Sequence, residues 1–161
     1  MKQINITFGS KYIVKQIIKK HPERKLFTFS STGQDDNIMI MDFSNLKPIF
    51  KNPIKFIVND SIIKNHSKPF ISVTSMILNE DDLKQFDSQF INLHHHHFQN
   101  GFMGIYNLRS ADNSFKVTIL NIWNSYNNYK KSEKNDPYLD INRYDKSNNY
   151  FYQKNYIALN L

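Results

Sequence analysis

The sequence predicts an α+β protein in which two small ferredoxin-like halves pack their sheets together. Strand and helix patterns follow one another as β-α-β-β-α-β in residues 66–161, which is the ferredoxin-like order. Residues 1–65 show a β-α-β-β version of the same pattern. Each half alone would bury too little apolar surface to be stable, so we expect the two halves to need each other.

The first half begins with a strand and a helix. Ile4, Ile6 and Phe8 alternate with polar neighbours, and this period of two predicts a strand over 4–8. Ser10 suits the N-cap of the helix that follows, since its hydroxyl can accept a backbone hydrogen bond. The helix has apolar residues at 13, 14, 17 and 18, and it should end before Pro22.

Two further strands complete this half. Strands are predicted over 25–31 and 37–43, joined by a turn at 32–36. Residues 52–65 fit either of two elements. Pro53 suits the first turn of a helix, whereas the β-branched content favours a strand.

The second half restarts after a boundary at 65–68. A strand is predicted over 70–78, and Asn79 is the predicted N-cap of a helix with three acidic residues in its first turn. The apolar stripe of this helix indicates that it runs as far as His97. Its members are Leu83, Phe86, Phe90 and Leu93, with His97 next in register.

The remaining elements alternate again. Strands are expected over 102–110 and 114–123, then a short helix over 126–135. Asp136 and Pro137 predict the start of a further helical piece through Tyr144, before a closing strand at 151–161. We expect Trp123 and the tyrosines of this region to pack helices onto the sheet.

Composition excludes several classes of site. The chain of 161 residues has no cysteine, which excludes disulfides, thiolate metal ligands and a cysteine nucleophile. With four glycines it contains neither dinucleotide-binding nor P-loop motifs. No apolar run approaches the roughly 20 residues that span a bilayer, and the N-terminus lacks the apolar core of a signal peptide. We therefore expect a cytoplasmic protein.

The net charge is +7, but the basic residues are dispersed along the chain. A basic protein can favour nucleic acid or an anionic small ligand. Because the lysines form pairs at most, no nucleic-acid stripe stands out, and nucleic acid is not the predicted partner.

Four consecutive histidines, His94 to His97, are the most conspicuous chemical feature. At 100° per residue, a continuing helix would turn only His94 and His97 inward and leave the middle two in water. We weigh three interpretations: solvated histidines at a helix end, a cofactor-binding pair formed by His94 and His97, and adventitious metal binding. Solvated histidines are the preferred interpretation, and no dedicated metal site is predicted.

The chain resembles a known bacterial family. The segments that carry the resemblance are ITFGSKYIVKQIIKKHPERKLFTFSS, PFISVTSMIL, FQNGFMGIYNLRS and SFKVTILNIWNS. They are similar to the family of the staphylococcal signal-transduction protein TRAP and the Bacillus haem-degrading monooxygenase HmoB. That resemblance implies a C-terminal antibiotic-biosynthesis-monooxygenase (ABM) domain and a fold in which one chain imitates the ABM homodimer, a dimeric α+β barrel.

The resemblance also assigns site positions. Haem-degrading members carry an Asn on the first ABM strand, a Trp on the later helix and an iron-ligating His. These positions fall at Thr74, near Ser132 and at Asn142, and all three differ from the family pattern. Leu93 lies near the place of a basic residue that usually meets a haem propionate.

Two functions follow as expectations. The first is a divergent TRAP-like binding or regulatory module whose usual haem-degrading residues are altered and whose ligand is haem or another hydrophobic small molecule. The second is a haem-degrading monooxygenase in which His94 or His97 replaces the missing ligand. Imidazole is a good ligand for haem iron, which is why the loss at Asn142 favours the first function.

Overall fold

The chain folds into an α+β structure built on a closed barrel of eight strands. The computed structural model describes residues 2–33, 36–144 and 150–161. Part of the predicted turn at 32–36 therefore lies outside the described residues. All strand pairs are antiparallel, and the order around the barrel is β1-β3-β2-β8-β5-β7-β6-β4.

The elements of the first 65 residues agree with most of the sequence-based expectations. The structure contains β1 (Gln3–Gly9), α1 (Lys11–Lys20), β2 (Leu26–Ser31), β3 (Ile38–Asp42) and β4 (Ile54–Ile63). Ser10 caps α1 as predicted, because its Oγ accepts a hydrogen bond from the backbone N–H of Ile13 at 3.4 Å. The segment 52–65, for which the sequence allowed a helix or a strand, forms the strand β4, which pairs with β1 on one side and β6 on the other.

The later part of the chain forms β5 (Phe70–Ile77), α2 (Glu80–Asn92), η1 (Leu93–His95), β6 (Phe102–Ser110), β7 (Lys116–Trp123), α3 (Tyr126–Asn135), η2 (Ile141–Arg143) and β8 (Phe151–Ala158). Of these elements, η1 and η2 are short 3-10 turns. Asn79 caps α2 as predicted, since its Oδ1 accepts from the N–H of Asp82 at 2.8 Å.

Two helix predictions were too long. The α-helix that was expected to reach His97 ends at Asn92 and continues as the single turn η1. The helical piece expected from Asp136 to Tyr144 is only the turn η2, and Asp136 instead ends α3, where its N–H bonds to the carbonyl of Ser132. At both places the local sequence pattern favours a longer helix, and contacts with distant segments override that preference.

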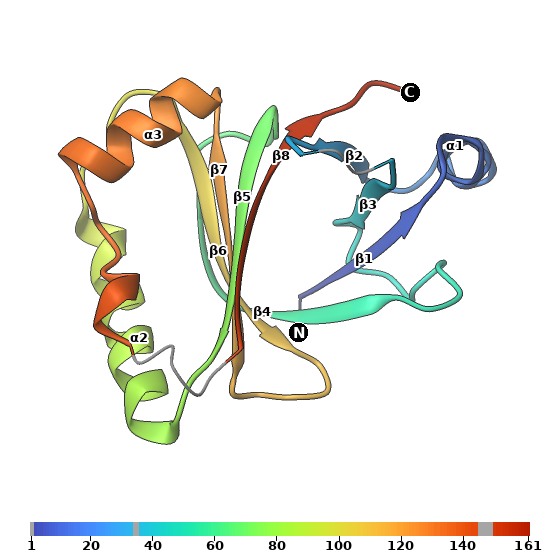
Figure 1. Ribbon diagram of the computed structural model, residues 1–161. Helices are drawn as coiled ribbons and strands as arrows, with labels where there is room; N and C mark the ends of the chain where they lie inside the picture. The colour runs from blue at the N-terminus through green and yellow to red at the C-terminus, as the bar shows by residue number, and fades with distance from the viewer. Residues whose placement is uncertain (1, 34–35, 145–149) are drawn as a thin grey trace.

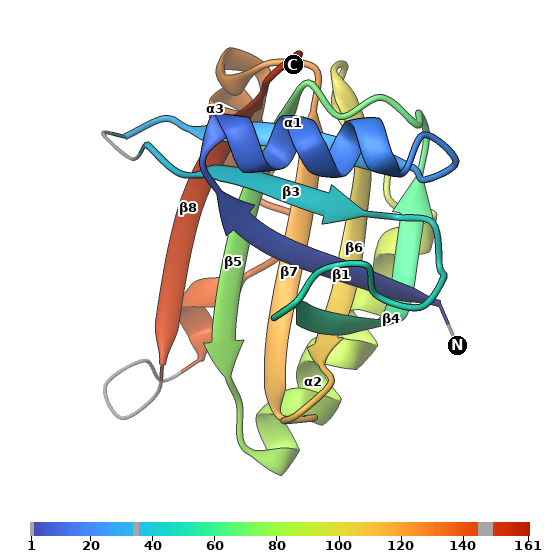
Figure 2. The ribbon, with the colours of Figure 1, turned by 90° about the vertical axis from the view of Figure 1, so that its right-hand side faces the viewer.

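The three helices lie outside the barrel. Figure 1 shows α2 and α3 along the outer face of the sheet formed by β5 to β8, and α1 on the opposite side of the molecule. Figure 2 shows that the strands near α1 run across the strands of the other side. No described helix is both long enough and apolar enough to cross a lipid bilayer.

Strand alternation separates the side chains of β5 into two layers of core, and a third cluster of Val14, Ile38, Ile40 and Phe50 includes the buried face of α1. In β5, Ile71 and Val73 point into the barrel, whereas Phe70 and Met76 point toward α2 and α3. The barrel interior includes Phe29 and Leu108, and these side chains are fully buried. Thr74 has the same parity as Phe70, so it faces the helices, and this parity positions the candidate site.

Candidate functional site between the sheet and α3

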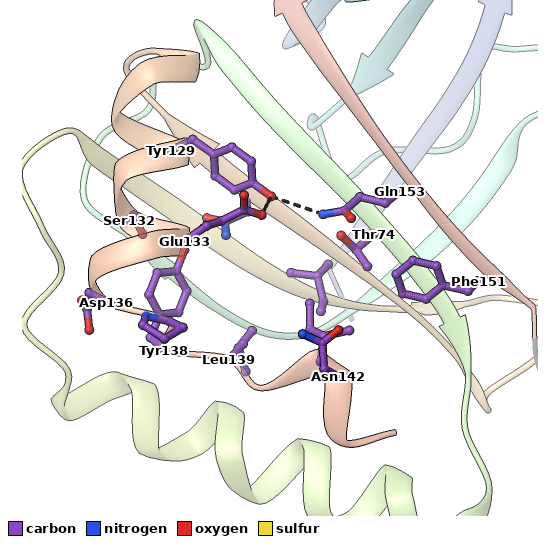
Figure 3. A pocket seen from close by; sticks show the side chains of 14 residues that line it. Thr74, Tyr129, Ser132, Glu133, Asp136, Tyr138, Leu139, Asn142, Phe151 and Gln153 are labelled. Carbon is purple, nitrogen blue, oxygen red and sulfur yellow. Dashed lines mark hydrogen bonds between the residues drawn. The ribbon is translucent and has the colours of Figure 1, made fainter. Parts of the chain in front are cut away.

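A cavity of about 290 Å³ lies between the outer face of the sheet and α3 with the segment that follows it (Figure 3). Its floor is a row across three adjacent strands, in which Thr74 of β5 pairs with Ile119 of β7 and Gln153 of β8. Its other walls come from α3, from the 136–142 segment and from Phe151. The remaining lining residues are Asn121, Tyr129, Ser132, Glu133, Asp136, Pro137, Tyr138, Leu139, Ile141 and Asn142.

The cavity brings together the positions that the family resemblance singled out. Thr74, Ser132 and Asn142 all line it, although they come from a strand, a helix and a 3-10 turn. Thr74 is 4% exposed and Ser132 is 2% exposed, so both hydroxyls lie deep, whereas Asn142 is exposed at the mouth. Leu93 is buried in the core under α2 and is not part of the lining.

A hydrogen-bond network fixes the phenol of Tyr129. Its hydroxyl donates to Oε1 of Glu133 at 2.7 Å and accepts from Oγ of Ser72 at 3.0 Å. Nε2 of Gln153 adds a third contact at 3.3 Å (Figure 3). Burial raises the pKa of Tyr129, and the acceptor Glu133 raises it further. Tyr129 is therefore a neutral hydrogen-bonding residue at ordinary pH.

Asn121 organises the opposite end of the cavity. Its Oδ1 accepts from the indole Nε1 of Trp123 and from the hydroxyl of Tyr138, both at 2.8 Å. Burial raises the pKa of Tyr138, so this phenol also stays protonated. Trp123 is fully buried and packs edge-on against Phe102, which confirms its predicted packing role.

The histidine run lies beside the site without lining it. His94 is exposed, and its Nε2 lies 2.9 Å from Oδ2 of Asp60. His97 is exposed, contrary to the expectation from helical spacing. The half-buried member is His96, whose Nε2 lies 2.8 Å from Oδ2 of the lining residue Asp136. The helix ends at Asn92, so the 100° rotation per residue no longer applies to these side chains.

Metal coordination is not supported by the described part of the chain. No three His, Cys, Asp or Glu side chains among residues 2–33, 36–144 and 150–161 gather closely enough to hold an ion. His94 and His96 are each engaged by a different carboxylate.

The donor groups that line the cavity determine whether haem can bind there. Among the described lining residues there is no His, Cys or Met, and neither is there a Lys or Arg that could meet a propionate. The two phenols have raised pKa values, which opposes phenolate ligation. The carboxylates of Glu133 and Asp136 would repel the propionates. These described residues do not fit haem.

Sequence reasoning did not single out Asn121, Glu133 or Gln153. Strand parity could have placed Asn121 and Gln153 on the face of Thr74 once the strand pairing was known. Glu133 lies four residues after Tyr129, so the two share one face of α3.

Comparisons with known proteins give structural matches alone. No protein-family model matches the chain, and no curated protein does either. Among solved structures, a major regulator of staphylococcal pathogenesis is 18% identical, with a TM-score of 0.77, over 99% of this chain and 100% of that one.

Two Listeria monocytogenes structures are similar over nearly the whole chain. An uncharacterised ferredoxin-fold protein related to antibiotic biosynthesis monooxygenases has a TM-score of 0.79 at 13% identity, over 100% of this chain and 96% of that one. A haem-degrading enzyme has a TM-score of 0.73 at 12% identity, over 97% of this chain and 99% of that one. The likeness establishes the fold. The chain therefore has the same fold as these three proteins.

Proposed function

We propose that this chain is a divergent TRAP-like binding module, in which the residues used for haem degradation have been replaced and the cavity takes a small molecule other than haem. The single observation that carries the proposal is the composition of the cavity at the family positions. Thr74, Ser132 and Asn142 line one cavity, yet none of them supplies an iron ligand of the family kind.

A regulatory role agrees with this architecture. Small-molecule sites are concave and mostly preformed, with a few polar groups that fix the orientation of a ligand. The network around Tyr129 and the anchored amide of Asn121 meet that description. Ligand binding next to α3 would stabilise this helix and its surroundings, and such a change can be transmitted to a partner. The likeness to a staphylococcal regulator supports this part of the proposal.

We also propose that the barrel is formed by two ferredoxin-like halves of the chain. Residues 1–65 contribute the strand order β4-β1-β3-β2, and residues 66–161 contribute β8-β5-β7-β6. Both follow the same relative order, and they join through the β2–β8 and β4–β6 pairs. This correspondence supports a chain that imitates an ABM homodimer within one molecule. The cytoplasmic location remains a prediction from the sequence.

Hemin titration tests the proposed function. The purified protein is titrated with hemin while the Soret band is recorded, and a reductant is then added in air. We expect no saturable Soret shift. A saturable shift that decays after about one equivalent has bound would establish haem degradation and overturn the proposal.

The second candidate function is haem degradation with a substitute ligand, which the likeness to the Listeria haem-degrading enzyme favours. This function requires His94 or His97 to approach the iron from outside the present lining. If hemin binds, the titration is repeated with His94→Ala and His97→Ala, and His95→Ala serves as the matched control. A Soret band that changes in neither of the first two variants removes these residues as ligands.

A further inference from the structure

Lys68 carries a buried amine outside the candidate site. It lies in the connection between β4 and β5, and only 6% of its surface is exposed. It does not line the cavity beside α3. Lysine is almost never fully buried unless an acidic group pairs with it, so the surroundings of this amine determine what it can do.

The side chain of Lys68 ends against an aromatic wall that borders the core of the barrel. Its Nζ lies 4.4 Å from the ring centroid of Phe27 and 4.5 Å from that of Phe43. Phe27 packs edge-on against Phe43 with a centroid separation of 5.5 Å, and Phe43 meets Tyr106 at 5.7 Å. All three rings pack against the barrel interior. The amine is therefore held against apolar surfaces that come from distant parts of the chain.

These surroundings compensate only partly for a positive charge on Lys68. Its Nζ donates a hydrogen bond to the backbone carbonyl of His66 at 3.1 Å, and the described residues give it neither a second acceptor nor a carboxylate partner. An ammonium group has three N–H donors, so two of them are left over. The rings attract a cation, but less strongly than a paired carboxylate would. Burial therefore lowers the pKa of Lys68 to about 8 from its ordinary value of 10.5.

A neutral lysine amine is a nucleophile. At pH 7 about one tenth of an amine with a pKa of 8 is neutral, against about one part in three thousand at 10.5. Desolvation by an apolar pocket is one of the ways in which a lysine is activated for attack on a carbonyl carbon. Lys68 combines this activation with a fixed position.

The same surroundings select the electrophile. The faces of aromatic rings carry negative potential, so Phe27 and Phe43 disfavour an anionic adduct such as a carbamate. A protonated imine keeps its positive charge at the nitrogen, where both ring faces attract it. With 6% of the residue exposed, only a small molecule can reach the amine. These features together fit a small, uncharged aldehyde.

We propose that Lys68 is a covalent binding site for a small, uncharged aldehyde, which it holds as an imine against Phe27 and Phe43. Nζ adds to the carbonyl carbon, and a proton passes from the nitrogen to the carbonyl oxygen to give a carbinolamine. The hydroxyl group then leaves with the second nitrogen proton as water, and the C=N bond forms. The step needs no oxidant or reductant, and water reverses it. It does not depend on the proposed function, because Lys68 lies outside the cavity.

Reductive trapping tests the proposal. The full chain is incubated at pH 7 with propanal and sodium cyanoborohydride, which reduces the imine to a stable secondary amine, and peptide mass spectrometry gives the rate at each lysine. We expect Lys68 to be alkylated at least about tenfold faster than Lys84, whose side chain is 71% exposed. Limited access to Lys68 reduces the larger ratio of neutral fractions. Lys68→Arg keeps the positive charge and should remove only the fast-reacting site.

Three controls separate an imine site from general lysine chemistry. Dialysis that removes propanal before the reductant is added should leave Lys68 unmodified, because the imine hydrolyses. In the chain unfolded by guanidinium, Lys68 and Lys84 should react at similar rates. Pyridoxal 5′-phosphate is a larger, anionic aldehyde, and it should label Lys84 faster than Lys68.

Each contrary result overturns the proposal. A rate at Lys68 equal to or below that at Lys84 in the folded chain means that the amine is not activated. A preference for Lys68 that survives unfolding assigns the reactivity to the local sequence instead of the aromatic wall. Modification that survives dialysis is not an imine, and faster labelling of Lys68 by pyridoxal 5′-phosphate contradicts the class of aldehyde.

Discussion

The imidazole Nε2 of His96 lies 2.8 Å from Oδ2 of Asp136, the residue that ends α3 and lines the cavity. The same ring packs against Phe98 and Tyr138, with centroid separations of 4.9 Å and 5.6 Å. His96 therefore connects the histidine run to Asp136 in the wall of the candidate site.

Replacing His96 by Ala should lower the free energy of unfolding by about 1 kcal/mol, because one hydrogen bond and the ring contacts are lost while water reaches Asp136. Chemical denaturation measures the change. His95→Ala removes the same ring from an exposed neighbour and should change the stability by less than about 0.5 kcal/mol. Equal effects of the two substitutions would contradict the assigned role of His96.

Asp87 should be far more important for stability than other acidic residues of α2. Its Oδ1 accepts a hydrogen bond from Nη2 of Arg109 and another from Nδ2 of Asn107 at 3.1 Å. Arg109 is 9% exposed, so Asp87→Ala leaves a largely buried guanidinium without its carboxylate, and only the uncharged oxygens of Asn107 and Leu108 still accept from it. We expect a loss of about 3 kcal/mol in the free energy of unfolding.

Glu80→Ala provides the control for Asp87→Ala, since Glu80 pairs with Lys84 on the exposed surface of α2 at 3.2 Å. The loss there should be below about 0.5 kcal/mol. Urea titrations of both variants give the comparison. The assigned role of Asp87 fails if its removal costs no more than that of Glu80.

Lys68 should make stability rise with pH above pH 8. It is 6% exposed, and its Nζ lies 4.4 Å and 4.5 Å from the ring centroids of Phe27 and Phe43. Burial lowers the pKa of Lys68 to about 8 from its ordinary value of 10.5. Below pH 8 both the folded and the unfolded chain carry the proton, so the full cost of burying the charge is present there.

Between pH 8 and pH 10 the unfolded chain keeps the Lys68 proton while the folded chain loses it, so the free energy of unfolding increases. Lys68→Met should remove this increase, whereas Lys84→Met, at an exposed position, should preserve it. Urea denaturation across this pH range measures the slope. Parallel slopes in Lys68→Met and the unsubstituted chain would refute the prediction.

Stability should then fall at still higher pH. Burial raises the pKa values of Tyr106, Tyr129 and Tyr138 above the ordinary value of 10.0, so the unfolded chain releases these protons first. The free energy of unfolding should therefore decrease above pH 10. Phenolate absorbance followed together with circular dichroism should show these tyrosines ionising as the chain unfolds. Their full ionisation in a folded chain would show that the phenols are not protected.

Gly101→Ala should destabilise the turn before β6. Gly101 has φ of +98°, and an added Cβ would lie 2.6 Å from Oδ1 of Asn124 and 2.7 Å from Nδ2 of Asn128. We expect a loss of about 2 kcal/mol, measured as a lower urea midpoint. Gly33→Ala has room for the methyl group and should be nearly neutral. A neutral Gly101→Ala would mean that this turn readily adopts another conformation.

Local chemistry made much of the fold predictable. Ser10 and Asn79 were recognised as N-caps because a side-chain oxygen before an apolar stripe satisfies free backbone N–H groups, and both make those bonds. The buried stripe of α2 was equally clear, since Phe86, Phe90 and Leu93 recur at helical spacing and are buried.

The position of the histidine run, the closure of the barrel and the cavity could not be predicted from local sequence patterns, because they depend on contacts between distant segments. The histidine run continues a helical pattern, but His96 reaches Asp136 only after the chain has left the helix. Closure of the barrel depends on pairs such as Phe29 with Ala158, which no local pattern encodes. The resemblance to a known family assigns Thr74 and Asn142 to site positions. The cavity that both residues line forms only when α3 packs on the sheet, and no local sequence pattern predicts it.

Closure of the barrel also decides how this protein can meet other chains. Each of the eight described strands has a hydrogen-bonded neighbour on both sides, so none of them is a free sheet edge. A free edge is the usual template on which another polypeptide adds a strand, and it is also where amyloid-like association begins. Partner recognition by this protein should therefore depend on side chains of the outer helices and loops, and sheet-to-sheet aggregation should require the barrel to open first.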